Sequence, residues 1–409
     1  MKPKTLYLAW RYLLFHKMKT TILFACLGLT FLLPLGVHFL VGYYETTLAA
    51  RALDTPLVIG APGNRFDLVL KSLYFATDYA DAVDMSDVEV VTKRNYGTAV
   101  PIHVRYYAHK LHTETEGEGV VGTERAPIVG TDLAYFELRK LEVAQGTFPL
   151  VLGDAVVGSK AARRLGVSVG EAILSNPTGF YNLAHSFQLR MPVVGVLAQS
   201  GSPDDHAVFV DIKTAWVLDG IGHGHDKVET PEDASLVNDA LSSDKNVVAA
   251  SGLAQYQKIT SENRDSFHFH GAPEDFPATA VLLFPEGERG HTLAVGRFNA
   301  RDDRQILAPS SVIKELMSIV FRIKDFFDAN FLLVTLTTAL FVTLVIVLSL
   351  RIRKKEMETL YRIGCARGTV FRLQAWEIVI VTGAGLALAT ILAYASLWLV
   401  PYFTGFLSV

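Results

Sequence analysis

The sequence of 409 residues has very little cysteine and lacks common motifs of nucleotide binding and metal-dependent hydrolysis. Its two cysteines are Cys26 and Cys365, so neither a disulfide framework nor a set of cysteine metal ligands is available. No Gly-Lys dipeptide occurs, which excludes the Walker A loop that holds nucleotide phosphates. No His-Glu-x-x-His motif occurs either, which excludes that type of zinc hydrolase. We therefore expect that the chain is not an enzyme.

Charged residues are also missing from three long apolar runs, which are the most informative feature of the chain. They are Thr20–Tyr44, Ala329–Leu350 and Ile378–Val400. Because a helix rises 1.5 Å per residue, runs of about 22 to 25 residues can cross a hydrocarbon core of about 30 Å. We predict three transmembrane helices, the first of which is retained. The alternative is a signal peptide cleaved near Ala50-Arg51-Ala52, but the apolar part of a signal peptide is only about 7–15 residues long.

Positive charge is concentrated beside these apolar runs. Residues 45–325 carry 37 acids and 26 bases, a balance of −11, whereas the rest of the chain carries 4 acids and 12 bases, a balance of +8. By the positive-inside rule, the segments rich in lysine and arginine are cytoplasmic. We therefore expect a bacterial inner membrane protein with a cytoplasmic N-terminus and a large periplasmic domain. Because topology accounts for the bases, we expect no nucleic acid partner.

The polar segment between the first two runs has the pattern of a mixed α+β domain. In the segment Leu57–Asn64, Gly and Pro predict a turn after a short strand. Short apolar runs predict further strands at Ala155–Gly158, Leu189–Leu197, Ala207–Val210, Thr279–Phe284 and Thr292–Phe298. Helices are predicted at Lys160–Leu165, between an N-cap at Ser159 and a stop at Gly166, and at Asp211–Leu218. The predicted fold class is an integral membrane α-helical anchor of three transmembrane helices, with a large inserted α+β extracytoplasmic domain of two subdomains.

One continuous helix is predicted to lead from this domain into the second span. No Pro or Gly interrupts the sequence between Pro309 and Leu350, and one apolar stripe has helical spacing, at Ile313, Leu316, Met317 and Val320. Such a helix would be about 65–70 Å long. The alternative is two helices joined by a bend near Asp325–Asp328.

These patterns divide the chain into eight parts. The predicted parts are a cytoplasmic amphipathic helix (1–19), the first span (20–44), a periplasmic α+β domain (45–308), a stalk helix (309–328), the second span (329–350), a cytoplasmic coupling segment (351–377), the third span (378–400) and an external C-terminal tail (401–409).

The segment from Lys354 to Arg367 is the most specific signal in the sequence. It combines a short helix and turn with an amphipathic stretch that leads to Glu377. A short helix along the membrane surface, apolar on one side and charged on the other, suits docking on a cytoplasmic partner. The alternative is a basic loop that only fixes topology. The candidate coupling residues are Glu356, Met357, Leu360, Arg362, Gly364 and Arg367.

This segment resembles the cytoplasmic signature of MacB/FtsX-type ABC transporter permeases, the type VII or mechanotransmission class. Glu356, Leu360, Gly364 and Arg367 match that signature, Met357 and Cys365 are mild replacements, and the basic residue of the family at position 361 has moved to Arg362. The N-terminal segment Leu8–Leu14, the segment Leu57–Tyr74 and the segment Gly195–Val210 are also similar to members of the family, so that the resemblance covers nearly the whole chain.

The resemblance implies a cytoplasmic ABC ATPase as partner, a second permease chain, and a MacB-like periplasmic core domain that receives the motion driven by ATP. ATP and magnesium would be bound by the partner, and this chain would have no cofactor of its own. A periplasmic or outer-membrane partner is a further expectation. Relatives have a fourth transmembrane helix, whereas this sequence stops at Val409. We expect that the fourth helix is truncated, absent or supplied by another chain.

Two His-x-His pairs form a second candidate site. They lie in Gly222-His-Gly-His-Asp226 and Phe267-His-Phe-His-Gly271. Alternate residues of a strand share a face, so each pair could give two imidazoles to one zinc ion. The alternative is that these segments are polar surface loops in a domain that contains many histidines. The candidate metal ligands are His223, His225, Asp226, His268 and His270.

Two functions therefore compete. The first is a permease subunit that transmits motion from a cytoplasmic ATPase to a periplasmic domain, for envelope export, lipoprotein or lipid release, or efflux. The second is a membrane-anchored periplasmic sensor or scaffold that binds metal or peptide without ATP coupling. A third candidate, an anchored hydrolase, lacks a catalytic constellation.

Overall fold

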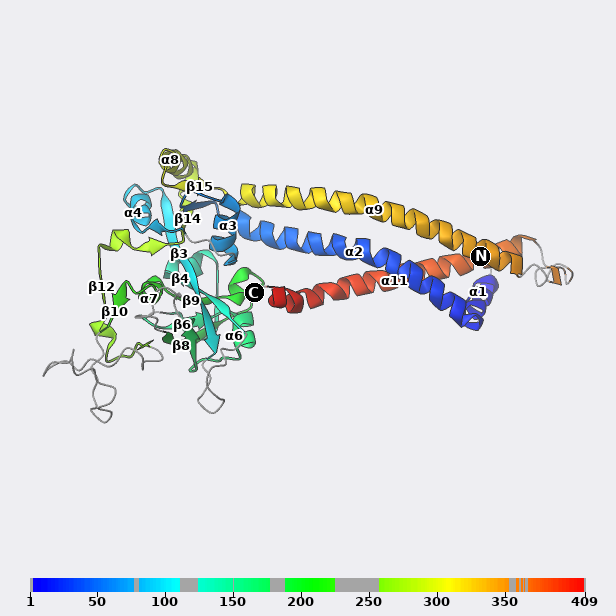
Figure 1. Ribbon diagram of the computed structural model, residues 1–409, viewed down its shortest axis with the longest axis horizontal. Helices are drawn as coiled ribbons and strands as arrows, with labels where there is room; N and C mark the ends of the chain where they lie inside the picture. The colour runs from blue at the N-terminus through cyan, green and yellow to red at the C-terminus, as the bar shows by residue number, and fades with distance from the viewer. Residues whose placement is uncertain are drawn as a thin grey trace, which may run out of the picture. The chain divides into compact units, whose positions relative to one another are not determined.

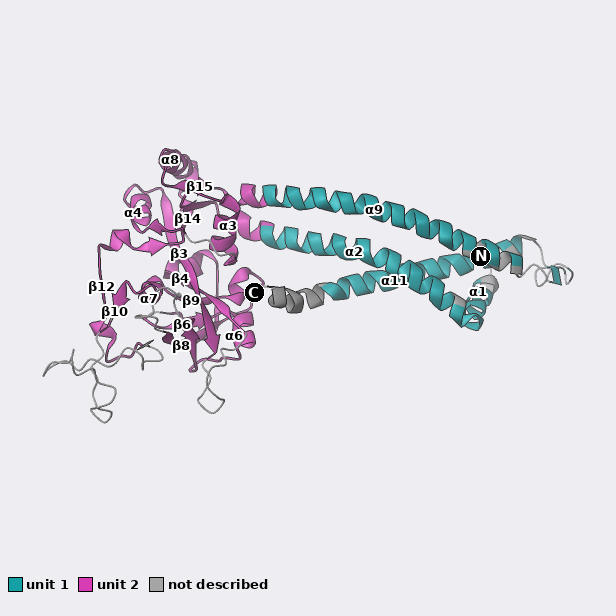
Figure 2. Ribbon diagram, viewed as in Figure 1, with its two compact units in different colours: residues 1–48, 315–409 teal, residues 49–314 magenta. Residues whose placement is uncertain are grey.

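Residues far apart in the chain come together, because its two ends form one unit and its middle forms another. The computed structural model describes residues 3–76, 81–110, 124–149, 151–176, 188–224, 257–352, 358–359, 362, 364 and 367–407. The helical unit comprises Met1–Leu48 and Glu315–Val409, and the globular unit comprises Ala49–Lys314 (Figure 2).

Long helices make up the described part of the helical unit. They are α1 (Pro3–Phe15), α2 (Lys17–Leu53), α9 (Pro309–Ile352) and α11 (Arg367–Leu407) (Figure 1). Three stretches of them are long and apolar enough to cross a membrane, namely Thr20–Leu53, Pro309–Leu344 and Phe371–Ser396. The three predicted apolar spans are therefore helical.

Some predicted boundaries differ from the observed ones. The N-terminal helix ends at Phe15, and Lys17 already begins α2. Helix α2 continues past the predicted end of the first span, up to Leu53. Residues 401–407, predicted as an external tail, continue α11. Apolar content marks the middle of each span, whereas backbone hydrogen bonding carries the helix further at its ends.

Helix α9 is unbroken over 44 residues, as the absence of Pro and Gly after Pro309 predicts. The predicted stalk and the predicted second span belong to this one helix, not to two. At 1.5 Å per residue the helix is about 66 Å long. Helix α2 differs, because Pro34 lies inside it together with Gly28, Gly36 and Gly42. Proline in a helix removes a backbone hydrogen bond, so α2 is the more easily bent of the two.

Small residues bring α2 and α11 into close contact within the helical unit. A Cβ atom added to Gly385 would lie 3.2 Å from the Cβ of Leu27 and 3.4 Å from the backbone N of Gly28. Close helix crossings at small residues are typical of membrane helices. On α9, the Oγ1 of Thr338 lies 3.2 Å from the Oγ1 of Thr30. A hydrogen bond between hydroxyls thus joins α2 to α9.

The globular unit is built on a mixed sheet. Its strands follow the order β11-β8-β6-β9-β4-β3-β14-β1-β15, while β5 pairs with β8, and β7 pairs with both β3 and β8. The strands of this sheet are β1 (Leu57–Gly60), β3 (Gly97–Lys110), β4 (Ala126–Thr131), β5 (Val143–Gly146), β6 (Ala155–Val157), β7 (Ala172–Ser175), β8 (Leu189–Leu197), β9 (Val208–Asp211), β11 (Gln257–Lys258), β14 (Ala280–Pro285) and β15 (Gln305–Leu307).

Strand β3 is long enough to serve two hydrophobic cores. Its first half pairs with β14 and its second half pairs with β4. One core contains Val281, Phe298 and other residues of β1, β14, α4 (Ser86–Lys93) and α8 (Gly287–Asn299). The other contains Ile128, Val210 and neighbours from β6, β8, α6 (Ser159–Leu165) and α7 (Ile212–Leu218).

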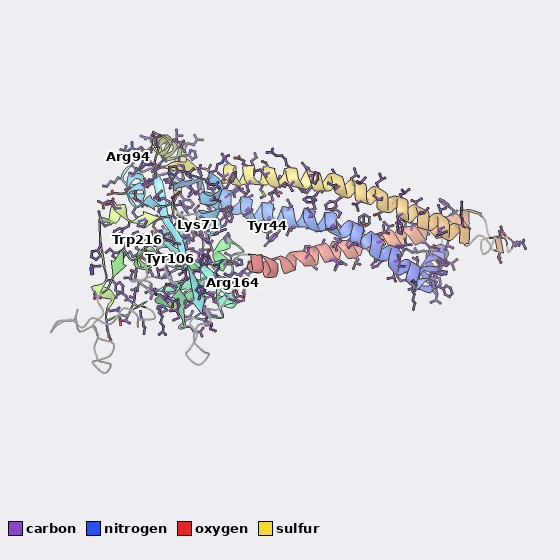
Figure 3. All side chains as sticks on the ribbon, in the orientation of Figure 1. Tyr44, Lys71, Arg94, Tyr106, Arg164 and Trp216 are labelled. Carbon is purple, nitrogen blue, oxygen red and sulfur yellow. The ribbon has the colours of Figure 1, made fainter. Side chains whose placement is uncertain are left out.

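A smaller aromatic cluster packs beside these cores. Trp216 lies on α7 (Figure 3). Its ring centroid lies 4.9 Å from that of Phe276 and 6.2 Å from that of Phe269. Its Nε1 donates a hydrogen bond of 2.8 Å to the carbonyl of Pro277. This bond satisfies the polar atom of a buried indole. The cluster holds β12 (His268–Phe269) and β13 (Pro277–Ala278) against α7.

Several predicted elements are confirmed. The strand at Leu189–Leu197 is β8, whose residues are alternately buried and half-buried. The predicted strands at 57, 155, 207 and 279 correspond to β1, β6, β9 and β14. Gly166 ends α6 in the left-handed conformation, with φ of 60°, as its role as a stop predicts. Asp211 begins α7, because its side chain accepts a hydrogen bond from the N–H of Lys213.

Two local predictions are wrong. Gly158, and not Ser159, is the N-cap of α6. Thr292–Phe298 belongs to helix α8 and is not a strand. The buried residues of α8 are Gly290, Ala294 and Phe298, which have the i, i+4 spacing of a helix, so the short apolar run was misleading. Gly290 permits the close contact, since a Cβ there would lie 2.3 Å from the carbonyl O of Tyr96.

Gly296 offers a test of α8. It is exposed, and a Cβ there would meet no atom within 4 Å. Gly296→Ala should raise the free energy of unfolding by about 0.5–1 kcal/mol, because glycine is a poor helix former, and Gly296→Pro should lower it by about 3 kcal/mol. Denaturant unfolding of the full chain measures both changes. A destabilising Gly296→Ala would contradict a helix at this position.

Candidate functional site

The strongest candidate site lies within the globular unit, which includes the last residues of α2 and the first residues of α9, and its first element is Arg51. Arg51 lies in the last turn of α2 and is 6% exposed. Its Nη1 and Nη2 donate to the two carboxylate oxygens of Asp204, each at 2.8 Å. Its Nε donates to the carbonyl of Leu73 at 3.3 Å. Asp204 is 1% exposed, so both partners of this two-pronged ion pair are buried.

Asp204 is held in a short loop that presents it to α2. It lies in the 3₁₀ helix η1 (Pro203–His206), and its carboxylate accepts from the hydroxyl of Ser202 at 2.8 Å. The neighbouring Asp205, also 1% exposed, accepts hydrogen bonds from the backbone N–H groups of Ser200 and Gly201. Asp205 therefore fixes the loop, and Asp204 is left to bind Arg51.

Tyr135 and Arg139 complete the cluster around the end of α2. The hydroxyl of Tyr135 donates to Asp204 at 2.5 Å and accepts from Arg51 at 2.5 Å. Burial raises the pKa of Tyr135, so the phenol stays protonated and remains a donor. Arg139 donates to the Oγ1 of Thr55 at 2.6 Å, and burial together with the charge of Arg51 lowers the pKa of Arg139. Thr55 in turn donates to the carbonyl of Arg51.

A second ionic cluster precedes α9. The Nε of Arg304 donates to Asp87 at 2.5 Å and its Nη2 donates to Asp84 at 2.6 Å. Arg301 donates to the other oxygen of Asp87 at 2.9 Å. Asp87 is fully buried in the first turn of α4, where a carboxylate also suits the helix dipole. This cluster ties the segment before β15 to α4.

The two helices are joined through neighbouring strands. Strand β1 begins at Leu57, soon after α2 ends at Leu53, and β15 ends at Leu307, directly before α9 begins at Pro309. Strands β1 and β15 pair antiparallel, with Val58 opposite Leu307. The side chain of Gln305 adds a hydrogen bond of 2.6 Å to the carbonyl of Ala61. Short links and a hydrogen-bonded ladder therefore connect α2 to α9.

The structure describes only part of the predicted coupling segment. Glu356, Met357 and Leu360 lie outside the described residues. Arg362 is helical and exposed, and Arg367 begins α11. Gly364 lies in a turn with φ of 94°, a conformation that side chains other than glycine rarely adopt. The sequence therefore places glycine where a turn before α11 requires it.

The predicted metal ligands are brought together only in part. Among the described residues, no group of three or more His, Cys, Asp or Glu side chains is arranged to hold a metal ion. His225 and Asp226 lie outside the described residues. The backbone of His223 in β10 (Gly222–His223) pairs with that of His268 in β12. The rings of His268 and His270 lie 4.8 Å apart.

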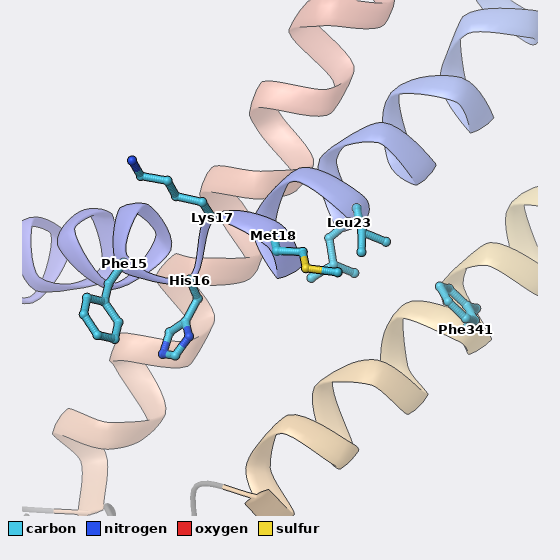
Figure 4. Close-up of a pocket in the computed structure, with 7 residues that line it drawn as sticks. Phe15, His16, Lys17, Met18, Leu23 and Phe341 are labelled. Carbon is cyan, nitrogen blue, oxygen red and sulfur yellow. The ribbon is translucent and has the colours of Figure 1, made fainter.

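A pocket of about 620 Å³ lies in the helical unit where α1 meets α2 (Figure 4). Its wall is mostly apolar and includes Phe341 of α9. The lining residues are Phe15, His16, Lys17, Met18, Ile22, Leu23 and Phe341. Ile22, Leu23 and Phe341 belong to the apolar helices, so this part of the wall is what lipid or another helix would cover.

Comparison with known proteins identifies the domain to which the first ionic cluster belongs. Residues 48–242 match the family model of the MacB-like periplasmic core domain. This chain carries a MacB-like periplasmic core domain. The family resemblance seen in the sequence, to MacB/FtsX-type ABC transporter permeases, is thereby confirmed. Together with the three apolar helices, the MacB-like domain indicates an inner membrane protein with an extracytoplasmic domain.

Solved structures of such domains are also similar. The periplasmic region of MacB from Actinobacillus actinomycetemcomitans is 12% identical, with 64% of this chain and 92% of that chain covered and a TM-score of 0.33. The extracellular domain of the noncanonic ABC-type transporter YknZ from Gram-positive bacteria is 11% identical, with coverages of 61% and 98% and a TM-score of 0.34. No curated protein matches this chain.

The sequence analysis did not single out the residues that bind the end of α2 within the MacB-like domain. Arg51 is separated from Tyr135 by 84 residues and from Asp204 by 153, so no local spacing marks the cluster. The available signals were a single arginine shortly after an apolar run and two adjacent acids in the segment Ser200–Asp205. Charged residues of this kind are rarely buried unless they are paired.

Breaking the Arg51–Asp204 pair should destabilise the MacB-like domain. Asp204→Asn leaves a buried guanidinium without a counter-charge, so we expect the free energy of unfolding to fall by about 3–5 kcal/mol. Thermal unfolding of the full chain in detergent, followed by intrinsic fluorescence, measures the loss.

Glu89→Gln is the matched control, because Glu89 and Lys93 form an ion pair of 2.5 Å on an exposed surface. Its effect should stay below about 1 kcal/mol. The double variant Arg51→Met with Asp204→Leu should be less destabilised than Asp204→Asn, since both charges are removed. Equal melting of Asp204→Asn and Glu89→Gln would show that the buried pair does not stabilise the junction.

Proposed function

We propose that this chain is the permease subunit of an ABC transporter and transmits motion from a cytoplasmic ATPase to its MacB-like domain. The N-terminus and the segment 351–377 face the cytoplasm in this proposal, because lysine and arginine are concentrated there. The ATPase partner binds and hydrolyses ATP with magnesium. This chain needs no catalytic residue and no cofactor for that role.

The observation that carries the proposal is the unbroken helix α9, which runs from the end of the second apolar run to strand β15. A helix of 44 residues without Pro or Gly after its first position resists bending, since its backbone hydrogen bonds continue throughout. Val312 and Ile313, in its first turn, are 5% and 2% exposed and anchor it in the globular unit. A displacement at one end of α9 is therefore passed to the other end.

The two ionic clusters determine where such a displacement acts. Arg51 fixes the end of α2 to η1, and Arg304 fixes the segment before α9 to α4. The β1–β15 ladder, with its short links, connects the two helices. If α9 moved relative to α2, the force would act first on this ladder and then on the two hydrophobic cores of the globular unit. An anchor that only tethers a domain to a membrane has no need of such a connection.

The segment around Gly364 is the proposed contact with the ATPase. Arg362 is exposed, and the turn at Gly364 separates it from α11. The proposed contacts are Glu356, Met357, Leu360, Arg362, Gly364 and Arg367. A second copy of this chain, or another permease, would complete the transporter. The work performed would be envelope export, release of lipoprotein or lipid, or drive to an efflux partner in the periplasm or outer membrane.

Substitution of Gly364 tests the contact with the ATPase. Alanine at φ of 94° costs about 1–2 kcal/mol, so Gly364→Ala should reduce co-purification of a Walker-type ATPase by roughly tenfold. Pull-down from native membranes with quantitative mass spectrometry measures this. Gly368→Ala, in the first turn of α11, is the control and should behave like the unchanged chain. If the unchanged chain brings down no ATPase, the proposed function fails and an anchored sensor or scaffold is favoured.

A break in α9 tests transmission separately from ATPase binding. Ile323 is 54% exposed in the middle of the first half of α9. Ile323→Pro should kink the helix at a cost of about 3 kcal/mol, whereas Ile323→Ala keeps it intact. The expected result is normal ATP hydrolysis by the complex, with loss of the ATP-dependent change in hydrogen exchange of residues 49–314. A change that survives in Ile323→Pro would show that motion does not pass through α9.

A further inference from the structure

The first 44 residues of the chain carry positive charge and no acid. The first acidic residue is Glu45. The lysines and arginines before it are Lys2, Lys4, Arg11, Lys17 and Lys19. Lys17 begins α2, and its exposed side chain has no ion pair within the described part of the chain. An anion that balances this charge therefore has to come from outside the N-terminal segment.

Hydrogen bonds fix the corner at which α1 meets α2. The Oγ1 of Thr20 lies 2.9 Å from the carbonyl oxygen of Leu13 and 3.1 Å from that of His16, so its hydrogen is shared between them. Leu13 is buried in a cluster with Leu27 of α2 and Val381 of α11. The corner is therefore held against α11, and the side chains on it have a defined position in the helical unit.

The pocket of about 620 Å³ at this corner has an apolar part and a basic part (Figure 4). Ile22, Leu23 and Phe341 belong to the helices that are long and apolar enough to cross a membrane. His16 and Lys17 line the same pocket. In Figure 4 the side chain of Lys17 points away from Phe341. The ammonium group and the apolar wall are therefore separated, as are the head group and the acyl chains of a phospholipid.

The exposed side of α1 has the composition of a membrane interface. Tyr7, Trp10 and Phe15 are all exposed there. Arg11 is exposed as well and lies four residues from both Tyr7 and Phe15, hence on their side of the helix. Aromatic and basic side chains gather together where lipid head groups meet the hydrocarbon core. Lipid is therefore the surrounding that suits the surface of α1 beside the pocket.

We propose that this pocket binds one anionic phospholipid. Its phosphate lies at Lys17 and His16, and one acyl chain lies against Leu23 and Phe341. Bases beside a membrane attract anionic lipids, and basic pockets between membrane helices bind their head groups. A helix of a second copy would cover the apolar wall equally well, but it would leave the charge of Lys17 unbalanced unless it also brought an acid. A zwitterionic lipid carries its own cation and is the weaker ligand.

Native mass spectrometry of the delipidated full chain in detergent tests the proposal. Titration with phosphatidylglycerol should show one retained lipid, and phosphatidylcholine with the same acyl chains should bind at least about fivefold more weakly, as should inorganic phosphate. Lys17→Gln should weaken the binding of phosphatidylglycerol about fivefold, which is the effect of one base at an anionic membrane surface. Leu23→Trp should weaken it as well, because the indole fills the space of the acyl chain.

Arg372→Gln is the matched control. Arg372 is an exposed base of α11 outside the described lining of the pocket, so its loss should leave the affinity for phosphatidylglycerol unchanged. Since Lys17 is exposed, Lys17→Gln should melt like the unchanged chain. Equal weakening by Lys17→Gln and Arg372→Gln would mean general attraction to a basic surface, and would overturn the proposal.

Two further results would also overturn it. One is that the unchanged chain retains no phosphatidylglycerol, or retains phosphatidylcholine equally well. The other is that Leu23→Trp separates a dimer of this chain without changing the retained lipid, which would show that a second copy covers the wall. No ATPase takes part in these measurements, so the permease proposal would stand in each case.

Discussion

A charge can remain inside a folded protein only when a partner satisfies it, and the junction of this chain depends on that constraint. Arg51 lies at the end of the first membrane helix and is buried against Asp204. The cost of removing both charges from water is large, so the pair persists only while its geometry is maintained. Tyr135, Ser202 and the carbonyl of Leu73 complete the hydrogen bonds around it. The end of α2 therefore has one well-defined position in the MacB-like domain.

A buried charge also fixes the segment before α9, but here the buried residue is an acid. The carboxylate of Asp87 is fully buried, and two arginines, Arg301 and Arg304, share it. The ladder between β1 and β15 then brings the two fixed ends together. Neither cluster contains a metal ligand set or a catalytic group among the described residues. Both clusters hold segments of the globular unit together through buried charge.

Local elements were predictable where a single physical signal decides the structure. The alternation of β8 and the glycine that ends α6 both operate over a few residues, and both predictions are confirmed. The error at Thr292–Phe298 has the same origin. Its short apolar run predicted a strand, but burial follows Gly290, Ala294 and Phe298, and Gly290 makes room for the backbone of Tyr96, a contact that no local pattern reveals.

The site could be predicted only in part, because long-range pairing decides it. Arg51 and Asp204 are 153 residues apart, and each looks like an ordinary surface charge in its own segment. The unbroken α9, in contrast, follows directly from the absence of Pro and Gly. For the histidines, spacing alone predicted a shared face. Gly222 and Gly224 lie against the rings of Phe269 and Phe267, which explains why the two segments pair. These glycines and phenylalanines could also be read from the sequence.

A single residue separates β15 from α9, and this short link limits how the length of α9 can change. Because Ala308 is the whole linker, the rotational setting of α9 about its own axis is fixed by the strand that precedes it. Each residue added to or removed from the helix turns everything beyond it by about 100°. Only changes near a whole number of turns would leave the far end of α9 in the same rotational setting. Insertions or deletions in α9 are therefore restricted to about whole helical turns, whereas surface loops elsewhere can accept insertions of any length.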